Sequence, residues 1–358
     1  MNVDRLLENN ALPFAGVFLV DDHHGRECAV VVARLTWELS PSGQAQVSRE
    51  ERPIRVAHPY RTGYDSSLHF PSDFVSDKVG TDVIVLASAH PPAGSTPSSM
   101  DVAVRVETGA ATLKKALRVH GPRVFMRSLT GVAPGPAGPI TRPVPIVYEQ
   151  AEGGTDASVS PPSRDAENPV GVGHARSSAS LVGARSYSIE PLGGNKPAGF
   201  GAIDRSWQPR ARWYGTTDAA YYQQRFPVVP ADFDLRFNSY AHPDLFSATP
   251  LRGDEPVELL GMTPEGAFRF KLPHYAPRFD AFVDGKEQRL ETHLDTFLID
   301  LELPEQRIVE LAWRAKVVLP RKSERLEKIR VTNETAVPTA TYQDLRSRIE
   351  AHGHHHEE

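Results

Sequence analysis

Hydrophobic and polar residues alternate along much of the chain, and the alternation has the period of two that is typical of β-strands. The segments "FAGVFLVDD" and "ECAVVVARLTWEL" are the first two such runs, and "DDHHGR" between them has the composition of a hairpin turn. The second run predicts a half-buried strand. One of its faces holds Val32, Arg34, Thr36 and Glu38, and the other holds Val31, Ala33, Leu35 and Trp37.

The same pattern returns further along the chain. In "MDVAVRVETG" it places Val102, Val104 and Val106 on one buried face, and "KKALRVHG" follows as a hairpin partner. Later strands are expected in "EPVELLGM", "GAFRFKLP", "FDAFVDG", "LETHLDTFLIDLE" and "RIVELAWRAKVVLP", with "TPEG" and "VDGK" as turns. Glycine and proline interrupt these runs at short intervals, as they do in proteins made of many strands.

Helical signals are few. One short helix is expected in the middle of the chain, with Thr216 or Thr217 as its N-cap, Asp218 in its first turn and Pro227 beyond its end. Thr341 is the expected cap of another short helix near the carboxyl end. Residues 151–197 are rich in glycine, serine and proline, so we expect a long irregular crossing segment there and no core element.

These patterns predict a mainly β protein of two packed antiparallel β subdomains, sandwich- or barrel-like, with few short helices and long irregular connecting loops. The expected divisions are an N-terminal subdomain over residues 1–150, the connecting segment over 151–197, a C-terminal subdomain over 198–322, and a tail with a short helix and a histidine-rich end over 323–358.

Composition narrows the class of protein. The chain has 358 residues, a formal net charge of −5 and a single cysteine, Cys28, so neither a disulfide within the chain nor a thiolate metal cage is expected. The negative charge argues against a nucleic-acid partner, and no apolar run approaches the ~20 residues of a membrane span. The first residues have no apolar stretch typical of a secretory signal, so we expect a cytoplasmic protein without membrane insertion.

Several residues have the chemistry of a metal or nucleophilic site. Glu291, His293 and Asp295 would share one face of a strand and present two carboxylates and an imidazole, although a solvated polar face is the simpler interpretation. His23 and His24 lie in a predicted turn, Cys28 lies in a strand, and His352, His354, His355 and His356 lie in the tail. We expect turn, core and adventitious roles for them. No G-x-S-x-G or G-x-x-x-x-G-K-[ST] motif occurs.

The stretch "NKPAGFGAIDRSWQPR", residues 195–210, has an unusual density of glycine and proline. Its two glycines lack the third glycine, the preceding strand and the following helix of a nucleotide-binding loop. We expect a rigid connection anchored in a core by Phe200, Ile203 and Trp207. We expect the prolines and glycines of this loop to shape its backbone and its charged residues to fasten it through ion pairs. These residues are Pro197, Gly199, Gly201, Asp204, Arg205, Pro209 and Arg210.

The chain resembles a known bacterial family, domain-of-unknown-function family 2169. The resemblance rests on motifs that occur in the family's order, among them "GTDVIVLASAHPP", "MDVAVRVETG", "PIVYEQAEGG", "NPVGVG", "KPAGFGAIDRSWQPR" and "GTTDAAYYQQRFPVVPADFDLRFNSYAHPD". Members of this family resemble adaptor proteins of type VI secretion. The resemblance therefore implies a non-enzymatic adaptor, or chaperone, that loads an effector onto the spike tip inside the producing cell, with the effector, the spike protein and a PAAR-type tip protein as partners.

The resemblance carries no catalytic residues, and we expect no catalytic site, metal or cofactor. An adaptor needs exposed apolar surface, and the expected partner-binding residues are Phe200, Trp207, Trp213, Tyr214, Tyr221, Tyr222 and Phe226. Core packing is the competing interpretation of these aromatic residues, since a helical "YYQQRF" must bury one face. Two other functions stay open at this point, a metal-dependent hydrolase that uses Glu291, His293 and Asp295, and a structural component of the spike.

Overall fold

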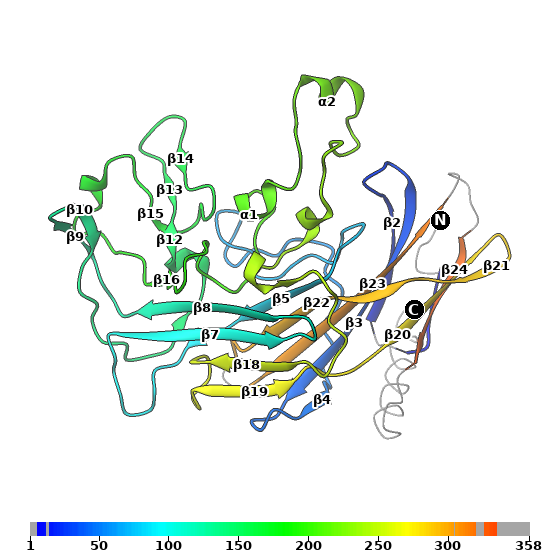
Figure 1. Ribbon diagram of the computed structural model, residues 1–358, viewed down its shortest axis with the longest axis horizontal. Coiled ribbons are helices and arrows are strands. Elements are labelled where there is room, and N and C mark those ends of the chain that lie inside the picture. Colours follow the sequence, from blue (N-terminus) through cyan, green and yellow to red (C-terminus); the bar gives the residue numbers. More distant parts are fainter. Residues whose placement is uncertain (1–5, 12–13, 304, 320–325, 335–358) are drawn as a thin grey trace, which may run out of the picture.

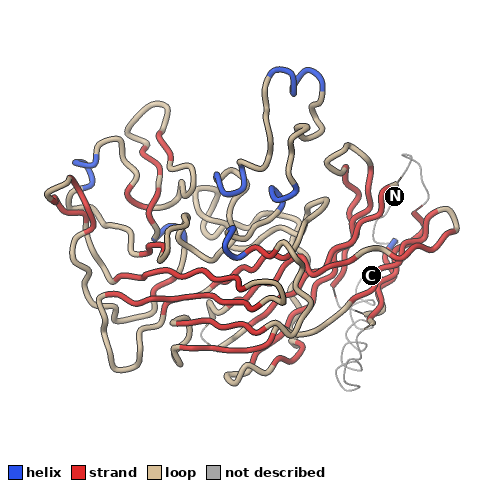
Figure 2. The backbone as a smooth tube through the Cα atoms, in the orientation of Figure 1, coloured by secondary structure: helices blue, strands red, loops and turns tan. Residues whose placement is uncertain are grey.

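The computed structural model describes residues 6–11, 14–303, 305–319 and 326–334, and strands dominate it (Figures 1 and 2). This confirms the predicted mainly β fold with few short helices, and none of the sheets in the described part closes into a barrel. The expected helix after Thr341 lies outside the described residues. Among the residues that are described, no helix has the length and apolarity needed to cross a bilayer.

The largest sheet has the strand order β17-β5-β22-β23-β3-β2, with β4 paired to β3. The predicted hairpin of β2 and β3 is confirmed, with Asp21 opposite Glu27. Most neighbours are antiparallel, while β5 and β22 pair in parallel. We call this the central sheet; its strands are β2 (Phe14–Asp21), β3 (Glu27–Leu39), β4 (Ala45–Val47), β5 (Thr81–Leu86), β17 (Phe246–Ser247), β22 (Thr292–Asp300) and β23 (Ile308–Val318).

A second sheet has the order β16-β8-β7-β18-β19. The expected hairpin of β7 and β8 is confirmed, and Val102, Val104 and Val106 are fully buried as the alternation predicts. Residues 151–197 do contribute to the core, contrary to expectation, because β16 pairs with β8 and buries Ile189. The strands are β7 (Ser99–Glu107), β8 (Thr112–His120), β16 (Ile189–Pro191), β18 (Pro256–Leu260) and β19 (Ala267–Lys271).

Smaller elements complete the fold. A four-stranded sheet consists of β1 (Leu7–Asn9), β24 (Leu326–Asn333), β20 (Pro277–Val283) and β21 (Lys286–Arg289). Two-stranded pairs are β9 (Phe125–Ser128) with β10 (Gly131–Pro134), β6 (Ser88–Ala89) with β11 (Val144–Pro145), β12 (Glu152–Gly153) with β15 (Val172–Gly173), and β13 (Thr155–Asp156) with β14 (Ser163–Arg164). The helices are α1 (Gln208–Ala211) and α2 (Ala219–Gln224), and the 3₁₀ turns are η2 (Tyr148–Gln150), η3 (Ser178–Leu181), η4 (Leu235–Asn238) and η5 (Pro243–Leu245).

One hydrophobic core joins the three larger sheets. Phe270 of β19 meets Phe297 of β22 at 6.4 Å between ring centroids, and Tyr275 meets Trp313 of β23 at 5.4 Å. The central sheet takes strands from residues 1–150 and from residues 198–322 alike. The division of the chain into those two subdomains stays a prediction.

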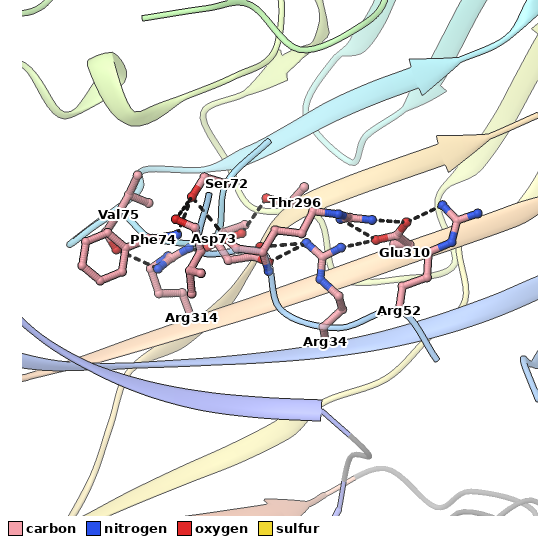
Figure 3. A network of polar contacts seen from close by, with 12 residues as sticks. Arg34, Arg52, Ser72, Asp73, Phe74, Val75, Thr296, Glu310 and Arg314 are labelled. Carbon is pink, nitrogen blue, oxygen red and sulfur yellow. Dashed lines mark hydrogen bonds and ion pairs between the residues drawn. The ribbon is translucent and has the colours of Figure 1, made fainter. Parts of the chain in front are cut away.

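The opposite face of the central sheet is polar and is buried as well. Residues 48–80, which we call the covering segment, contain no regular strand or helix and lie across this face (Figure 3). Arg34 is only 1% exposed and Thr36 is fully buried. The prediction that β3 is half-buried is therefore wrong, because the covering segment excludes water from the face that carries these two side chains.

Glu310 on β23 is the centre of an ion cluster on this face (Figure 3). It pairs with Arg34 of β3, and from the covering segment with Arg52 at 2.9 Å and Arg55 at 2.8 Å. The other side of the Arg34 guanidinium binds Asp73 at 2.7 Å. Burial alone would raise the pKa of Glu310, but the charges of Arg34, Arg55 and Arg52 outweigh it and lower the pKa to about 2.

A second cluster lies farther along the same face. The Lys78 ammonium group lies 2.6 Å from an oxygen of Asp82 on β5 and donates a hydrogen bond to Thr296 of β22. Asp295 accepts from Arg314 at 2.6 Å. Burial opposes the ionisation of Asp295, yet Lys78 and Arg314 lower its pKa to about 2. Each buried charge of these two clusters thus has a partner of opposite sign, which is a condition under which charges are tolerated inside a protein.

Replacing Glu310 by glutamine should lower the free energy of unfolding by about 3–5 kcal/mol, because three arginines lose their common counter-ion in a largely buried site. Denaturant titration measures this loss. Glu258→Gln is the matched control, since Glu258 pairs with a largely exposed arginine, Arg269, and should cost less than about 1 kcal/mol. Equal losses in the two variants would contradict the role given to the buried cluster.

The same variant gives a pH prediction. The pKa of Glu310 lies below that of an ordinary glutamate, so its contribution is complete above about pH 4.5 and disappears as the pH falls toward 2. The difference in unfolding free energy between the natural protein and Glu310→Gln should therefore shrink over that interval. A difference that stays constant from neutral pH to pH 2 would show that Glu310 is not held in the ionised form.

Candidate functional site

The glycine-rich stretch at residues 195–210 is wrapped around one aromatic ring, that of Tyr148. A Cβ atom on Gly199 would lie 2.4 Å from this ring, so only glycine fits there. At Gly201 the same test gives an ordinary contact distance of 3.7 Å. The Tyr148 hydroxyl donates a hydrogen bond of 2.9 Å to the Gly201 carbonyl. The loop therefore owes its tight course to close packing, as expected of a rigid connection.

The aromatic residues of this loop are anchors. Trp207 meets the Tyr148 ring edge to face at 5.1 Å, and Ile203 packs beside them. Phe200 is fully buried, and Trp207 is buried as well. Phe200 and Trp207 consequently lie out of reach of a partner, and the prediction that they form part of a partner-binding surface is wrong. Their core-packing interpretation holds because the Tyr148 ring and the central core enclose them.

Polar groups fasten the loop mainly through hydrogen bonds, where ion pairs were expected. Arg210 is buried and donates to the carbonyl oxygens of Ile203 and Phe237, with its guanidinium 4.0 Å from the centre of the Tyr240 ring. Asp204 accepts from the Tyr60 hydroxyl at 3.0 Å. Burial and the adjacent Asp204 together raise the pKa of Tyr60 to about 12, which keeps this hydroxyl a donor. The two prolines of the loop, Pro197 and Pro209, are buried, and Arg205 is exposed.

Residues 212–238 leave this loop and form a projection, which we call the arm (Figure 1). The arm consists of one outgoing and one returning segment. Near the base a hydrogen bond of 2.9 Å from the Asp234 amide to the Trp213 carbonyl connects the two. Farther out, the Thr216 amide and hydroxyl both donate to Asp232. A helix of six residues is unstable alone, so α2 depends on such contacts to hold its place.

Asp218 is the N-cap of α2, and its carboxylate accepts from the Tyr221 amide. The prediction that Thr216 or Thr217 caps this helix is wrong, because the Thr216 side chain is bonded to Asp232 across the arm. Tyr221 is buried and underlies the end of the arm, with Tyr222 and Phe226 packed against its ring at 5.0 and 6.2 Å. Tyr222 is 60% exposed and Phe226 is 63% exposed.

The lower part of the arm is an aromatic cluster that leans on the β2–β3 turn. Tyr214, Phe233 and Phe237 are in mutual ring contact at 5.0 to 6.1 Å. The Phe233 ring stacks on His23 of the turn, and a Cβ on Gly25 would collide with Val228. At the base, the Arg236 guanidinium covers the half-buried Trp213 ring at 3.4 Å. The arm therefore stands on a packed base and presents Tyr222 and Phe226 at its end.

A buried lysine lies beside the root of this loop. Lys115 on β8 is only 3% exposed, and its ammonium group donates one long hydrogen bond of 3.2 Å to the Asn195 carbonyl. Among the described residues, no carboxylate oxygen lies within 4.0 Å of it. Burial lowers the pKa of Lys115 to about 7, against a weak opposing effect of Asp244. Lys115 therefore has no counter-ion, unlike the basic residues under the covering segment.

The residues predicted as metal ligands do not come together. Asp295 is fully buried and bound to Arg314, while Glu291 is exposed at the strand's start. A register shift between Leu294 and Thr296 breaks the alternation that would align them. Within the described ranges, no group of three histidine, cysteine or acidic residues is placed to hold a metal ion. The histidine-rich tail lies outside those ranges.

The two remaining candidate sites, the His23 and His24 pair and Cys28, lie in surroundings that indicate a role in the fold. His23 and His24 lie in the β2–β3 turn, where Asp22 accepts from the His24 amide and from the Arg26 amide and guanidinium. Cys28 is buried in β3, and burial raises the pKa of its thiol. A thiol with a raised pKa is a poor nucleophile at neutral pH, which agrees with the core role expected from the sequence.

The molecule is thus a multi-sheet β protein with a covered polar face and one aromatic arm on a glycine-shaped loop. Residues 24–314 match the profile of a family described as "Uncharacterized protein conserved in bacteria (DUF2169)", and the chain belongs to this family. No curated protein and no solved structure matches the chain. The matched region includes the whole covering segment, the loop and the arm.

Sequence reasoning missed the role of Tyr148, which shapes the loop, and the charge of Lys115, which the fold buries. Tyr148 lies in "PIVYEQAEGG", one of the motifs that carry the family resemblance, so a signal for it was present. "KKALRVHG" gave no such signal for Lys115. Alternation assigns Lys115 and Leu117 to the same buried face, yet a lysine at the edge of such a run usually reaches water.

Gly199→Ala should destabilise the protein by about 1–3 kcal/mol, because the added methyl group overlaps the Tyr148 ring. Gly201→Ala, two residues away in the same loop, is the control and should change the unfolding free energy by no more than about 0.5 kcal/mol. The denaturant concentrations at the unfolding midpoints of the two variants measure this difference in stability. Similar midpoints for the two would show that the loop moves aside without cost.

Lys115→Met should stabilise the protein by an amount on the order of 3–5 kcal/mol at or below pH 7. Between pH 7 and about 10.5 the unfolded chain holds a proton on Lys115 that the folded chain has released, so the natural protein gains stability as the pH rises. The advantage of the variant should therefore fall to nearly zero at pH 10.5. Lys114→Met, at the exposed neighbour, should show no such trend, and a pH-independent difference for Lys115→Met would contradict the assignment.

Proposed function

We propose that this protein is a non-enzymatic cytoplasmic adaptor. It binds a type VI secretion effector and helps to load it onto the spike protein and the PAAR-type tip protein before secretion. The family resemblance suggests the secretion role, and one observation on the molecule supports an adaptor in particular. That observation is the pair of exposed aromatic side chains, Tyr222 and Phe226, at the end of the arm.

Two neighbouring aromatic rings in water are costly, and a partner that buries them recovers this free energy. The rings of Tyr222 and Phe226 lie 6.1 Å apart, close enough to enter one pocket of a partner together. Tyrosine and phenylalanine supply much contact area with few rotatable bonds, so little conformational entropy is lost on binding. The packed base of the arm reduces this entropic cost further, because the side chains are already held in place.

The remaining predicted contact residues differ in how far solvent reaches them. Trp213 and Tyr214 are half-buried at the base, and Tyr221 is buried beneath the two exposed rings. We therefore assign direct contact to Tyr222 and Phe226, and a supporting role to Trp213, Tyr214 and Tyr221. Effector binding at the arm would leave the central sheet and its covering segment unchanged.

The double variant Tyr222→Ser and Phe226→Ser should weaken binding to the effector about tenfold or more, while leaving the unfolding free energy within about 0.5 kcal/mol of the natural protein. The measurement is co-expression of the tagged chain with effector and PAAR-type proteins from the same genome, followed by isothermal titration of the purified pair. Tyr64→Ser is the matched control, since Tyr64 is exposed and lies on the covering segment.

If neither the effector nor the PAAR-type protein forms a complex with the natural chain at micromolar concentration, the adaptor proposal fails. If the complex forms and the double variant binds as tightly as the natural chain, the adaptor role survives and the arm is not its contact surface. Loss of binding in Tyr64→Ser alone would place the contact on the covering segment.

A further inference from the structure

A second surface with unusual side chains lies at the β9–β10 hairpin, at the opposite end of the molecule from the β20–β21 strands (Figure 1). Val124 and Met126 are 45% and 48% exposed on this hairpin, and Leu129 at its tip is fully exposed. Val124 and Met126 are two residues apart on an extended strand, so they share one face. The hairpin therefore offers an apolar strip that the rest of the described chain leaves uncovered.

A groove of about 560 Å³ runs beside this strip. Its lining residues come from 120–124, from Gln150, from Arg185, Ser186 and Ser188, and from the proline-rich run 136–145, which forms one wall. Its apolar lining consists of Val124, Val144, five prolines and the almost fully buried Ile140. The proline-rich run is fixed to the body by backbone hydrogen bonds, from the Gly138 amide to Pro122 and from the Ile140 amide to Pro97, so this wall is held in place.

Three arginines line the same groove: Arg123, Arg142 and Arg185. Arg123 has a counter-ion, since it donates to Glu190 at 2.6 Å. Arg142 and Arg185 are exposed, and in the described part of the chain no carboxylate lies within ion-pair distance of either. Arg127 on β9 adds a further exposed guanidinium nearby. The chain as a whole has a net charge of −5, so this basic corner is a local feature.

We propose that this groove, which we call the hairpin groove, binds an extended segment of a partner protein that carries both acidic and apolar side chains. Planar guanidinium groups bind carboxylates through two parallel hydrogen bonds, and Arg142 and Arg185 have that capacity unused. The apolar strip formed by Val124, Met126 and Leu129 would take the aliphatic side chains of the same segment. This surface is separate from the arm, and the proposal does not depend on the role given to the arm.

A nucleic acid is the other polyanion that arginines bind, and the hairpin groove fits it less well. Binding of a nucleic acid rests largely on contacts between basic side chains and phosphates, on the order of 6–10 of them in a strongly salt-dependent complex, and a basic patch or stripe provides them. Here three or four arginines surround a partly apolar lining that contains no phenylalanine, tyrosine or tryptophan for base stacking, and its one imidazole, that of His120, is hydrogen-bonded to Glu190. An acidic and partly apolar polypeptide matches both the charge and the lining.

The test uses the full chain and three labelled probes: a short peptide of alternating glutamate and leucine, its lysine and leucine counterpart, and a single-stranded DNA oligonucleotide. Fluorescence anisotropy should show binding of the glutamate peptide that weakens as salt increases. The double variant Arg142→Glu and Arg185→Glu should reduce this affinity about tenfold or more. Hydrogen exchange with the bound peptide should show protection within residues 122–127 and 138–145.

The control is Arg49→Glu with Arg252→Glu, which makes the same charge change at two exposed arginines outside the hairpin groove. This variant should keep the natural affinity, and so should the arm variant Tyr222→Ser with Phe226→Ser. Equal losses in the groove and control variants would overturn the proposal, because they would indicate net charge alone. Tighter binding of the lysine peptide or of the DNA, or no binding of the glutamate peptide, would also overturn it.

Discussion

An arginine that has lost its contact with water is tolerated only where protein groups take over its hydrogen bonds, and carboxylates do so for Arg34 at the middle of the central sheet. The strand that carries Arg34, β3, does not supply the partners of its guanidinium. Glu310 comes from β23, and Asp73 comes from the covering segment. The strand order and the course of residues 48–80 are thereby tied to one buried charge. An irregular segment of this length keeps one conformation because its carboxylates and guanidinium groups meet fixed partners on the sheet.

The loop at residues 195–210 obeys a different constraint, which is steric. Gly199 leaves room for the Tyr148 ring, and that ring in turn supports Trp207 at the start of α1. Since α1 leads directly into the arm, the position of Tyr222 and Phe226 depends on a contact some distance away in the core. Tyr148 and Gly199, which belong to motifs that carry the family resemblance, thus fix the conformation of the loop. The loop in turn positions the arm, and the arm carries the exposed rings.

Local features of the fold could be predicted from the sequence because they depend on neighbouring residues. Alternation gave the β2–β3 and β7–β8 hairpins, and Pro227 with Asp218 placed α2 within a few residues. The covering segment could not be predicted in this way, since residues 48–80 have no period, and their partners lie far away along the chain. The orientation of Asp295 could not be predicted either, because a β-bulge decides which face of the sheet its side chain occupies. Nor could β16 be predicted, because it forms a strand by pairing with β8, which is distant in sequence. At the candidate site, the sequence supplied the aromatic residues, and the fold decided which were exposed.

The place of β23 between β3 and β22 has a consequence for how the protein is made. Arg34 and Glu310 are 276 positions apart, so a ribosome releases β3 long before its neighbour β23 exists, and β5 long before its neighbour β22. During that time β3 has one vacant edge, and the face that carries Arg34 is exposed to solvent, a state prone to wrong pairing. Completion of the central sheet awaits β22 and β23. The order of synthesis therefore leaves the early strands of this sheet unpaired for longer than in a chain of consecutive hairpins.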